Sequence, residues 1–126
     1  HLNPLMDATY HQIKSNFGDE NAQKLCAVVR SAVKKIETNS INFNIECGFE
    51  YKTAYLFSQD EKQSEELQKI IESTNEVGIK METCDSIPFP IPFEKAASSA
   101  KSCPHTLGER LRLRRIVNKV CNFIFI

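Results

Sequence analysis

Residues 47–57 read Cys-Gly-Phe-Glu-Tyr-Lys-Thr-Ala-Tyr-Leu-Phe, and this stretch decides how the rest of the chain is organised. Aromatic side chains recur in it at every second position, which is typical of a β-strand with one buried face. The segments on both sides have the three-to-four-residue apolar spacing of amphipathic helices. The sequence therefore predicts an α+β domain built around this strand.

Length and composition describe a single small domain. The chain has 126 residues, of which 41% are hydrophobic and 25% are charged, as in a globular protein. Sixteen basic and sixteen acidic residues cancel, so overall charge predicts neither nucleic acid nor a membrane as a partner. The charge is unevenly spread, because residues 94–126 carry seven Lys and Arg but two acidic residues. We therefore examine the tail from residue 94 onward separately.

The five cysteines are odd in number and widely spaced, with no C-x-x-C pair, so they predict neither a disulfide framework nor a zinc site. No apolar run approaches the roughly 20 residues that a membrane-spanning helix needs. Together these features predict a cytoplasmic protein. The chain begins at His1 and not at Met. We therefore expect a fragment, a processed chain or a trimmed one.

Two helices are predicted before the strand. The first starts near Pro4, carries apolar residues at helical spacing and ends at Gly18. Asp19 is the predicted N-cap of the second, and asparagines predict a connector from residue 37 to residue 45. The predicted apolar face of the second helix is Ala22, Leu25, Val29, Ala32, Val33 and Ile36. Its predicted polar face is Lys24, Arg30, Lys34 and Lys35.

A third helix, a short strand and a proline-rich segment follow. Ser58 and Glu61 have the spacing of a capping box, and Gly78 is placed to end the helix. Residues 79–83 alternate as in a short strand. Alternate prolines in residues 87–93 remove backbone donors, so we expect an extended, partly buried crossing segment. The predicted buried face of the third helix is Leu67, Ile70, Ile71, Thr74 and Val77.

This order of elements resembles the FAD-dependent oxidoreductases of the D-amino-acid/glycine oxidase (DAO) family. The resemblance rests on residues 47–57, the capped helix after them, the break at residues 78–79 and Asp-Ser-Ile-Pro-Phe-Pro at residues 85–90. It is greatest to the bacterial subgroup in which a Rieske iron–sulfur domain is often appended. Residues 1–5 resemble the segment that follows the flavin-proximal Ser/Thr/Gly-rich stretch in such enzymes.

The resemblance implies that residues 1–95 form part of the helical insertion and substrate-domain region of a DAO-type flavoprotein. The intact enzyme would oxidise an amino acid or amine with FAD, and the partner of this chain would be the remainder of the flavoprotein fold. That family holds FAD at a G-x-G-x-x-G turn. The four glycines here are isolated from one another: Gly18, Gly48, Gly78 and Gly108. We therefore expect this chain alone to bind FAD weakly and to be inactive.

Residues 96–126 do not match the family. Where the resemblance implies a strand and then a loop with a Phe-His-Pro sequence, residues 97–105 read Ala-Ser-Ser-Ala-Lys-Ser-Cys-Pro-His. One hypothesis is that this tail comes from a shifted reading frame. Its segment 110–117 alternates Arg with Leu as a strand would, and it also fits a basic amphipathic helix. Such a helix could bind nucleic acid, anionic lipid or an acidic partner. The other interpretation is that the basic composition is accidental and comes from a non-native reading frame.

Three residues are candidate site residues, and no catalytic or metal-binding residue is assigned. His1 is a candidate for cofactor binding near the flavin, and its alternative is a solvated terminal residue. Tyr51 and Tyr55 are candidates for substrate binding, and their alternative is packing of the sheet. We expect His11 on the surface, and His105 has neighbours unlike those of the family's loop histidine. A second function remains open, namely a stand-alone, non-enzymatic protein-interaction module.

Overall fold

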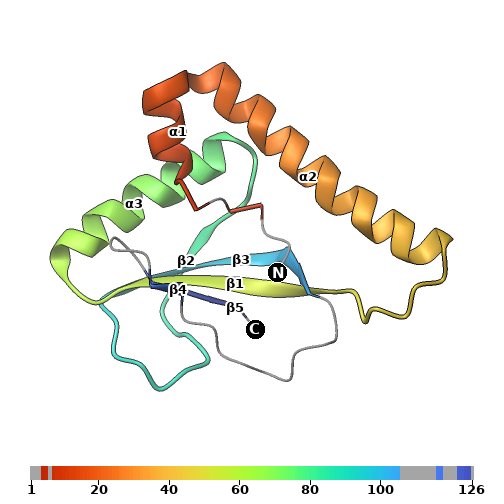
Figure 1. Cartoon of the computed structure of the whole chain (residues 1–126). Helices are drawn as coiled ribbons and strands as arrows, with labels where there is room; N and C mark the ends of the chain where they lie inside the picture. Colours follow the sequence, from red (N-terminus) through yellow and green to blue (C-terminus); the bar gives the residue numbers. More distant parts are fainter. Residues whose placement is uncertain (1–3, 6, 106–115, 118–121, 126) are drawn as a thin grey trace.

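A computed structural model describes residues 4–5, 7–105, 116–117 and 122–125 (Figure 1). It contains three helices and an antiparallel sheet, with the helices on one face of the sheet. The elements in chain order are α1 (Tyr10–Phe17), α2 (Asp19–Asn42), β1 (Glu50–Ser58), α3 (Glu61–Glu76), β2 (Glu82–Cys84), β3 (Lys95–His105), β4 (Ile116–Val117) and β5 (Asn122–Phe125). The predicted α+β class, with two N-terminal helices before a small sheet and a capped helix, is confirmed.

Helix α1 begins later than predicted, at Tyr10, because Thr9 supplies its N-cap. The Thr9 hydroxyl accepts the backbone N–H of Gln12, and the Gln12 side chain accepts the backbone N–H of Thr9. Gly18 ends α1 as predicted, with a left-handed φ of 82° that favours glycine. Gly18 is also the N-cap of α2, so the prediction that Asp19 is the cap is wrong and Asp19 is the first helical residue.

Helix α2 runs to Asn42, through most of the predicted connector. Asparagine has a low helix propensity, but the difference amounts to only a few tenths of a kcal/mol, roughly, for each residue. The helix ends where Phe43 caps it and Asn44 adopts a positive φ of 48°. Its buried residues, Ala22 and Cys26, lie in its first half, and Ile36 of the predicted apolar face is exposed. Among the described residues no helix is both long and apolar enough to cross a membrane.

The sheet is built around β1 and β3. Strands β2, β3 and β1 form a small antiparallel sheet, and β5 and β4 continue it in the order β2-β3-β1-β5-β4. The pairing of β1 with β3 extends from Ser58 opposite Lys95 to Glu50 opposite His105. The regional boundary predicted at residues 95 and 96 therefore falls at the start of β3, and residues 96–105 share one sheet with β1. Most of the basic segment 110–117 lies outside the described residues.

The two faces of the sheet are buried by different parts of the chain. On the helix side, the core joins Ala54 and Leu56 of β1 to the helices and to Met81. The predicted face of α3 is confirmed: Leu67, Ile70, Ile71 and Thr74 are buried, and Val77 packs against them. On the other side, Phe57 and Ala96 are covered by the proline-rich segment. Its Ile and Phe side chains are half-buried and its prolines are exposed, so the predicted crossing segment is also confirmed.

The capping box predicted from Ser58 is wrong, because β1 continues through Ser58. Asp60 caps α3 instead: Asp60 Oδ1 accepts the backbone N–H of Gln63 at 2.8 Å. The buried Ser58 hydroxyl lies 2.7 Å from Ser64 Oγ and donates to the backbone carbonyl of Lys95. It therefore ties β1 to α3 and β3. Gly78 follows the end of α3 with a φ of 87°, as predicted for a left-handed terminator.

The strand predicted over residues 79–83 forms at Glu82–Cys84. Ile79 and Met81 are buried in the core as the alternation predicts. The side chain of Asn75 accepts the backbone N–H of Met81 at 2.9 Å and donates to its carbonyl at 3.0 Å. Because this amide satisfies both backbone groups of Met81, the segment needs no strand partner there.

Candidate functional site

The two tyrosines that were predicted to bind substrate lie on opposite sides of the sheet. The register between β1 and β3 shifts between Lys52 and Ala54, and the extra residues of this irregularity lie in β3. The contacts of each ring show its side. The Tyr51 hydroxyl donates a hydrogen bond to Glu37 of α2, whereas the Tyr55 ring packs edge-on against Phe89 at 6.3 Å between centroids. Tyr51 therefore lies on the helix side and Tyr55 on the side of the proline-rich segment.

Tyr51 lines a cavity of about 710 Å³ between α2, the sheet and the turn at residues 78–80. Pockets that hold small molecules have volumes on the order of 300–1,000 Å³. Tyr55 is not part of the lining. The polar residues of the lining are Arg30, Ser31, Lys34, Tyr51, Lys80 and Ser99. The described residues of the lining contribute three cationic side chains and three hydroxyls, and none of these residues is acidic.

Glu37 lies behind the cavity and holds two lining residues in place. Its Oε2 accepts Lys34 Nζ at 2.7 Å and the Tyr51 hydroxyl at 3.1 Å. The hydrogen bond from Lys34 holds the pKa of Glu37 below its ordinary value, so this carboxylate stays ionised. Burial first, and the Glu37 carboxylate second, raise the pKa of Tyr51. The phenol therefore keeps its proton and remains a hydrogen-bond donor.

Arg30 faces the turn on the other wall of the cavity. One of its guanidinium nitrogens, Nη1, donates to the carbonyl of Gly78 at 3.2 Å. No ion pair joins Arg30 to an acidic side chain within the described part of the chain. The hydroxyl of Ser99 donates to the carbonyl of Lys80 at 2.8 Å, which fixes the turn to β3. The cavity is thus formed by a helix, a turn and a strand that are hydrogen-bonded to one another.

The described lining of the cavity is suited to binding. Nucleophilic catalysis needs a nucleophile beside a base, and the lining residues that the structure describes include no His, Cys or carboxylate. Cations and hydroxyls around an apolar wall suit an anionic group instead. In the described residues no group of three or more His, Cys, Asp or Glu side chains could hold a metal ion.

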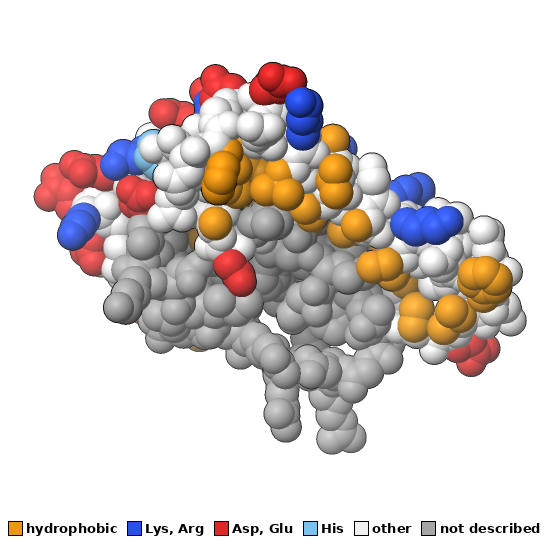
Figure 2. All heavy atoms as spheres, turned by 45° about the horizontal axis from the view of Figure 1, so that its top comes forward, with side chains coloured by type: hydrophobic (Ala, Val, Ile, Leu, Met, Phe, Trp, Pro, Cys, Tyr) orange, Lys and Arg blue, Asp and Glu red, His pale blue; other side chains and the backbone are white. Residues whose placement is uncertain are grey.

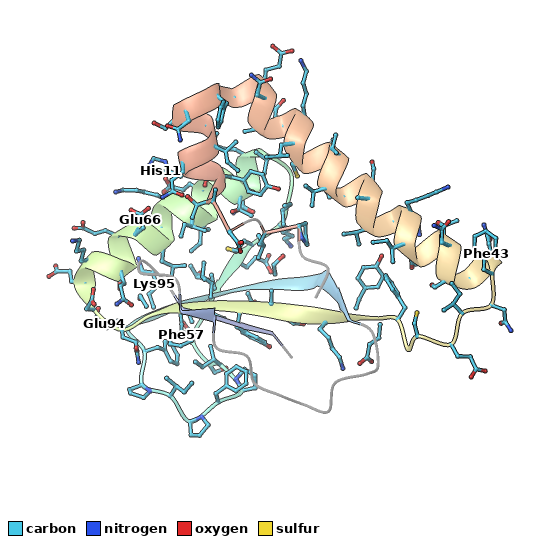
Figure 3. All side chains as sticks on the ribbon, viewed as in Figure 1. His11, Phe43, Phe57, Glu66, Glu94 and Lys95 are labelled. Carbon is cyan, nitrogen blue, oxygen red and sulfur yellow. The ribbon has the colours of Figure 1, made fainter. Side chains whose placement is uncertain are left out.

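The other candidate residues lie apart from the cavity or outside the described chain. His1 lies outside the described residues. His11 is exposed on α1, as predicted (Figure 3). The backbone of His105 lies in β3 opposite Glu50. The sequence-based interpretation did not select Arg30 as a site residue, because it placed the polar face of α2 in solvent. The feature that could have identified Arg30 is its spacing of four residues from Lys34, which puts both cations on one face of the helix.

A second surface feature is an apolar patch at the far end of α2. We define it as Ile41, Phe43 and Ile45, whose exposed fractions are 70%, 73% and 54%. Figure 2 shows hydrophobic side chains gathered there, and Figure 3 places Phe43 at the end of the helix. Contiguous exposed apolar side chains of this kind mark interaction surfaces.

Comparison of the chain with protein-family models, with curated proteins and with solved structures found no match. The function is therefore inferred from the residues of this chain, its cavity and its apolar patch.

Proposed function

We propose that this chain forms the substrate-side part of an FAD-dependent oxidoreductase of the DAO family, acting on amino acids or amines. The observation that carries the proposal is the order of elements on which the resemblance rests. Strand β1, the capped helix α3, the break at Gly78 and the proline-rich crossing segment occur as folded elements in that order. The bacterial subgroup with an appended Rieske domain is the proposed source.

The described residues do not fit the FAD pyrophosphate. Backbone amides at a helix N-terminus preceded by a glycine-rich turn hold such a group. Asp19 and Glu20 occupy the first turn of α2, and Asp60 caps α3, where carboxylates oppose a second anion. At the start of α1 the Thr9 hydroxyl already accepts the backbone N–H of Gln12. In this proposal FAD carries the hydride chemistry and is held by another part of the enzyme, so we assign no catalytic step to this chain.

The apolar patch fits an interface with that other part. Exposed Ile41, Phe43 and Ile45 extend beyond the core of this chain, where a second folded unit could bury them. Burial of large apolar side chains contributes roughly 1.5–3 kcal/mol each, so such contacts can hold two units together. The free thiols of Cys26, Cys47 and Cys84 agree with a reducing cytoplasm, where we place the enzyme.

The test begins with the DNA that flanks the coding sequence. If an in-frame extension encodes a strand, a Gly-rich turn and a helix, the extended protein is expressed and purified. We expect it to show the visible absorbance of bound flavin, which bleaches when amino acids or amines are added without oxygen. The 126-residue chain, treated alike, is the control and should purify colourless. An extended protein without flavin, or a flavin that no amine or amino acid reduces, contradicts the proposal.

The second candidate function is a non-enzymatic protein-interaction module, and the apolar patch favours it as well. In that case the 126-residue chain itself binds a partner, without any flavin-binding extension. Substitution of Phe43 by Ser would then abolish binding of that partner in a pull-down followed by titration with the purified proteins. Flavin reduction by the extended protein would exclude this second function.

A further inference from the structure

We infer that the cavity beneath α2 binds a small organic anion, through the carboxylate or phosphate group of that ligand. Arg30, Lys34 and Lys80 bring three positively charged side chains to one cavity, and none of the lining residues that the structure describes is acidic. This charge distribution opposes the chain's composition, because acidic residues outnumber basic ones in residues 1–93. The inference does not depend on the proposed flavoenzyme.

Arg30 is the expected anchor for the anion. A guanidinium group carries five N–H donors in a fixed fork, and Arg30 uses Nη1 to donate a hydrogen bond to the carbonyl of Gly78. Further donors remain to bind two oxygens of a carboxylate or phosphate side by side. Since Arg30 forms no ion pair among the described residues, an incoming anion need not displace a carboxylate from it.

Lys34 and Tyr51 complete the polar side of the site. Glu37 holds both from behind through one carboxylate oxygen, so Lys34 Nζ and the Tyr51 hydroxyl are fixed beside the cavity. An ammonium group has three N–H donors, and the contact with Glu37 uses one of them. Lys80 pairs with Glu82 at 2.7 Å on an exposed surface and adds only a weaker, screened attraction.

The apolar part of the lining indicates that the ligand is organic and not a bare ion. Pro4 and Ile79 are buried, and Val33 is half-buried on the wall formed by α2. The volume of about 710 Å³ exceeds what an inorganic oxyanion would fill. An apolar group attached to the anion would cover this wall while its oxygens meet Arg30.

The test is calorimetric titration of the 126-residue chain with three probes of one shape class: phenylacetate, phenylphosphate and uncharged phenylacetamide. We expect at least one of the two anions to bind, with phenylacetamide at least roughly tenfold weaker, because a hydrogen bond to a charged group contributes about 1.5–3 kcal/mol. The stronger of the two anions identifies the group for which the site is built. Failure of both anions to bind, or equal binding of phenylacetamide, overturns the inference.

Two variants locate the binding in the cavity. Arg30→Gln should weaken anion binding at least roughly tenfold, and Lys34→Gln should weaken it as well. Lys35→Gln is the matched control, because Lys35 is exposed on the same helix and does not line the cavity. Circular dichroism shows whether each variant is folded. If Arg30→Gln does not fold, the affinity of Lys34→Gln decides whether the anion binds in the cavity. Equal affinity in the cavity variants and the Lys35→Gln control overturns the inference.

Discussion

The hydroxyl of Tyr51 in β1 donates a hydrogen bond to Glu37 Oε2 in α2, over 3.1 Å. The buried residues of α2, Ala22 and Cys26, lie well before Glu37 along the helix. This bond therefore links the distal half of the helix to the sheet, at the point where α2 has left the core. It also sets one wall of the candidate anion site.

Removing the charge of Glu37 should make Tyr51 a stronger acid. A carboxylate beside a phenol disfavours the phenolate and raises its pKa, so Glu37→Gln should lower the pKa of Tyr51 toward the ordinary value of 10.0. Ultraviolet absorbance of tyrosinate, measured against pH in the wild-type chain and the variant, follows this change. Glu20→Gln is the control, because Glu20 pairs with Lys24 on the exposed surface of the same helix. An unchanged titration in Glu37→Gln would contradict the hydrogen bond between Tyr51 and Glu37.

The positions of Tyr51 and Tyr55 mark the limit of what alternation in β1 can predict. The period of two correctly identified β1 and placed Phe57 in a buried position. It cannot reveal the register shift between Lys52 and Ala54, because that shift comes from extra residues in β3. Nor can it reveal that Tyr51 bonds to α2 while Tyr55 packs against Phe89 on the other side of the sheet.

The core beneath the proline-rich segment should depend on Phe57. Its side chain is fully buried against Ala96 and the Ile and Phe residues of that segment (Figure 3). Phe57→Ala should lower the free energy of unfolding by about 3–5 kcal/mol, since it leaves a cavity as well as losing burial. Urea denaturation followed by circular dichroism measures this change.

Phe43→Ala is the matched control for Phe57→Ala. The Phe43 side chain is 73% exposed, so the same substitution there should change the free energy of unfolding by less than about 0.5 kcal/mol. Equal losses in the two variants would mean that the segment over Phe57 does not form a core.

The N-cap of α3 distinguishes the sequence-based prediction, a capping box from Ser58, from the structure, in which Asp60 is the cap. Asp60→Ala should destabilise the chain by about 1 kcal/mol, because Asp60 accepts the backbone N–H of Gln63 at the start of the helix. Glu65→Ala, an exposed substitution farther along α3, is the control and should have little effect. Urea denaturation of both variants measures the difference. If the Asp60→Ala chain is as stable as the control, Asp60 does not stabilise α3 as its N-cap.

The candidate anion site could not be predicted for a different reason. Helical spacing shows which side chains share a face, and it correctly grouped Arg30 with Lys34. It does not show what lies opposite that face. The turn at Gly78 and the strand residue Ser99 reach α2 only through tertiary folding. Arg30 and Lys34 remain exposed and also line the cavity, because the turn and the strand lie opposite this face.

Tyr10 should make the stability of the chain fall at alkaline pH. Its side chain is 2% exposed, and its hydroxyl donates to the carbonyl of Pro4 at 2.8 Å. Burial is the main cause that raises the pKa of Tyr10 far above the ordinary 10.0, with Cys26 adding to it. The unfolded chain therefore loses this proton first. The stabilising contribution of the protonated phenol is fully present below about pH 10 and is lost as pH rises toward the folded pKa.

Tyr10→Phe tests this pH dependence. The variant should be less stable by about 1–3 kcal/mol at neutral pH, because the buried carbonyl of Pro4 loses its donor. Between about pH 10 and about pH 12 its free energy of unfolding should decline less steeply than that of the wild-type chain. Urea denaturation at several pH values gives both quantities. If Tyr10→Phe and the wild-type chain decline in parallel, the buried phenol is not what couples stability to alkaline pH.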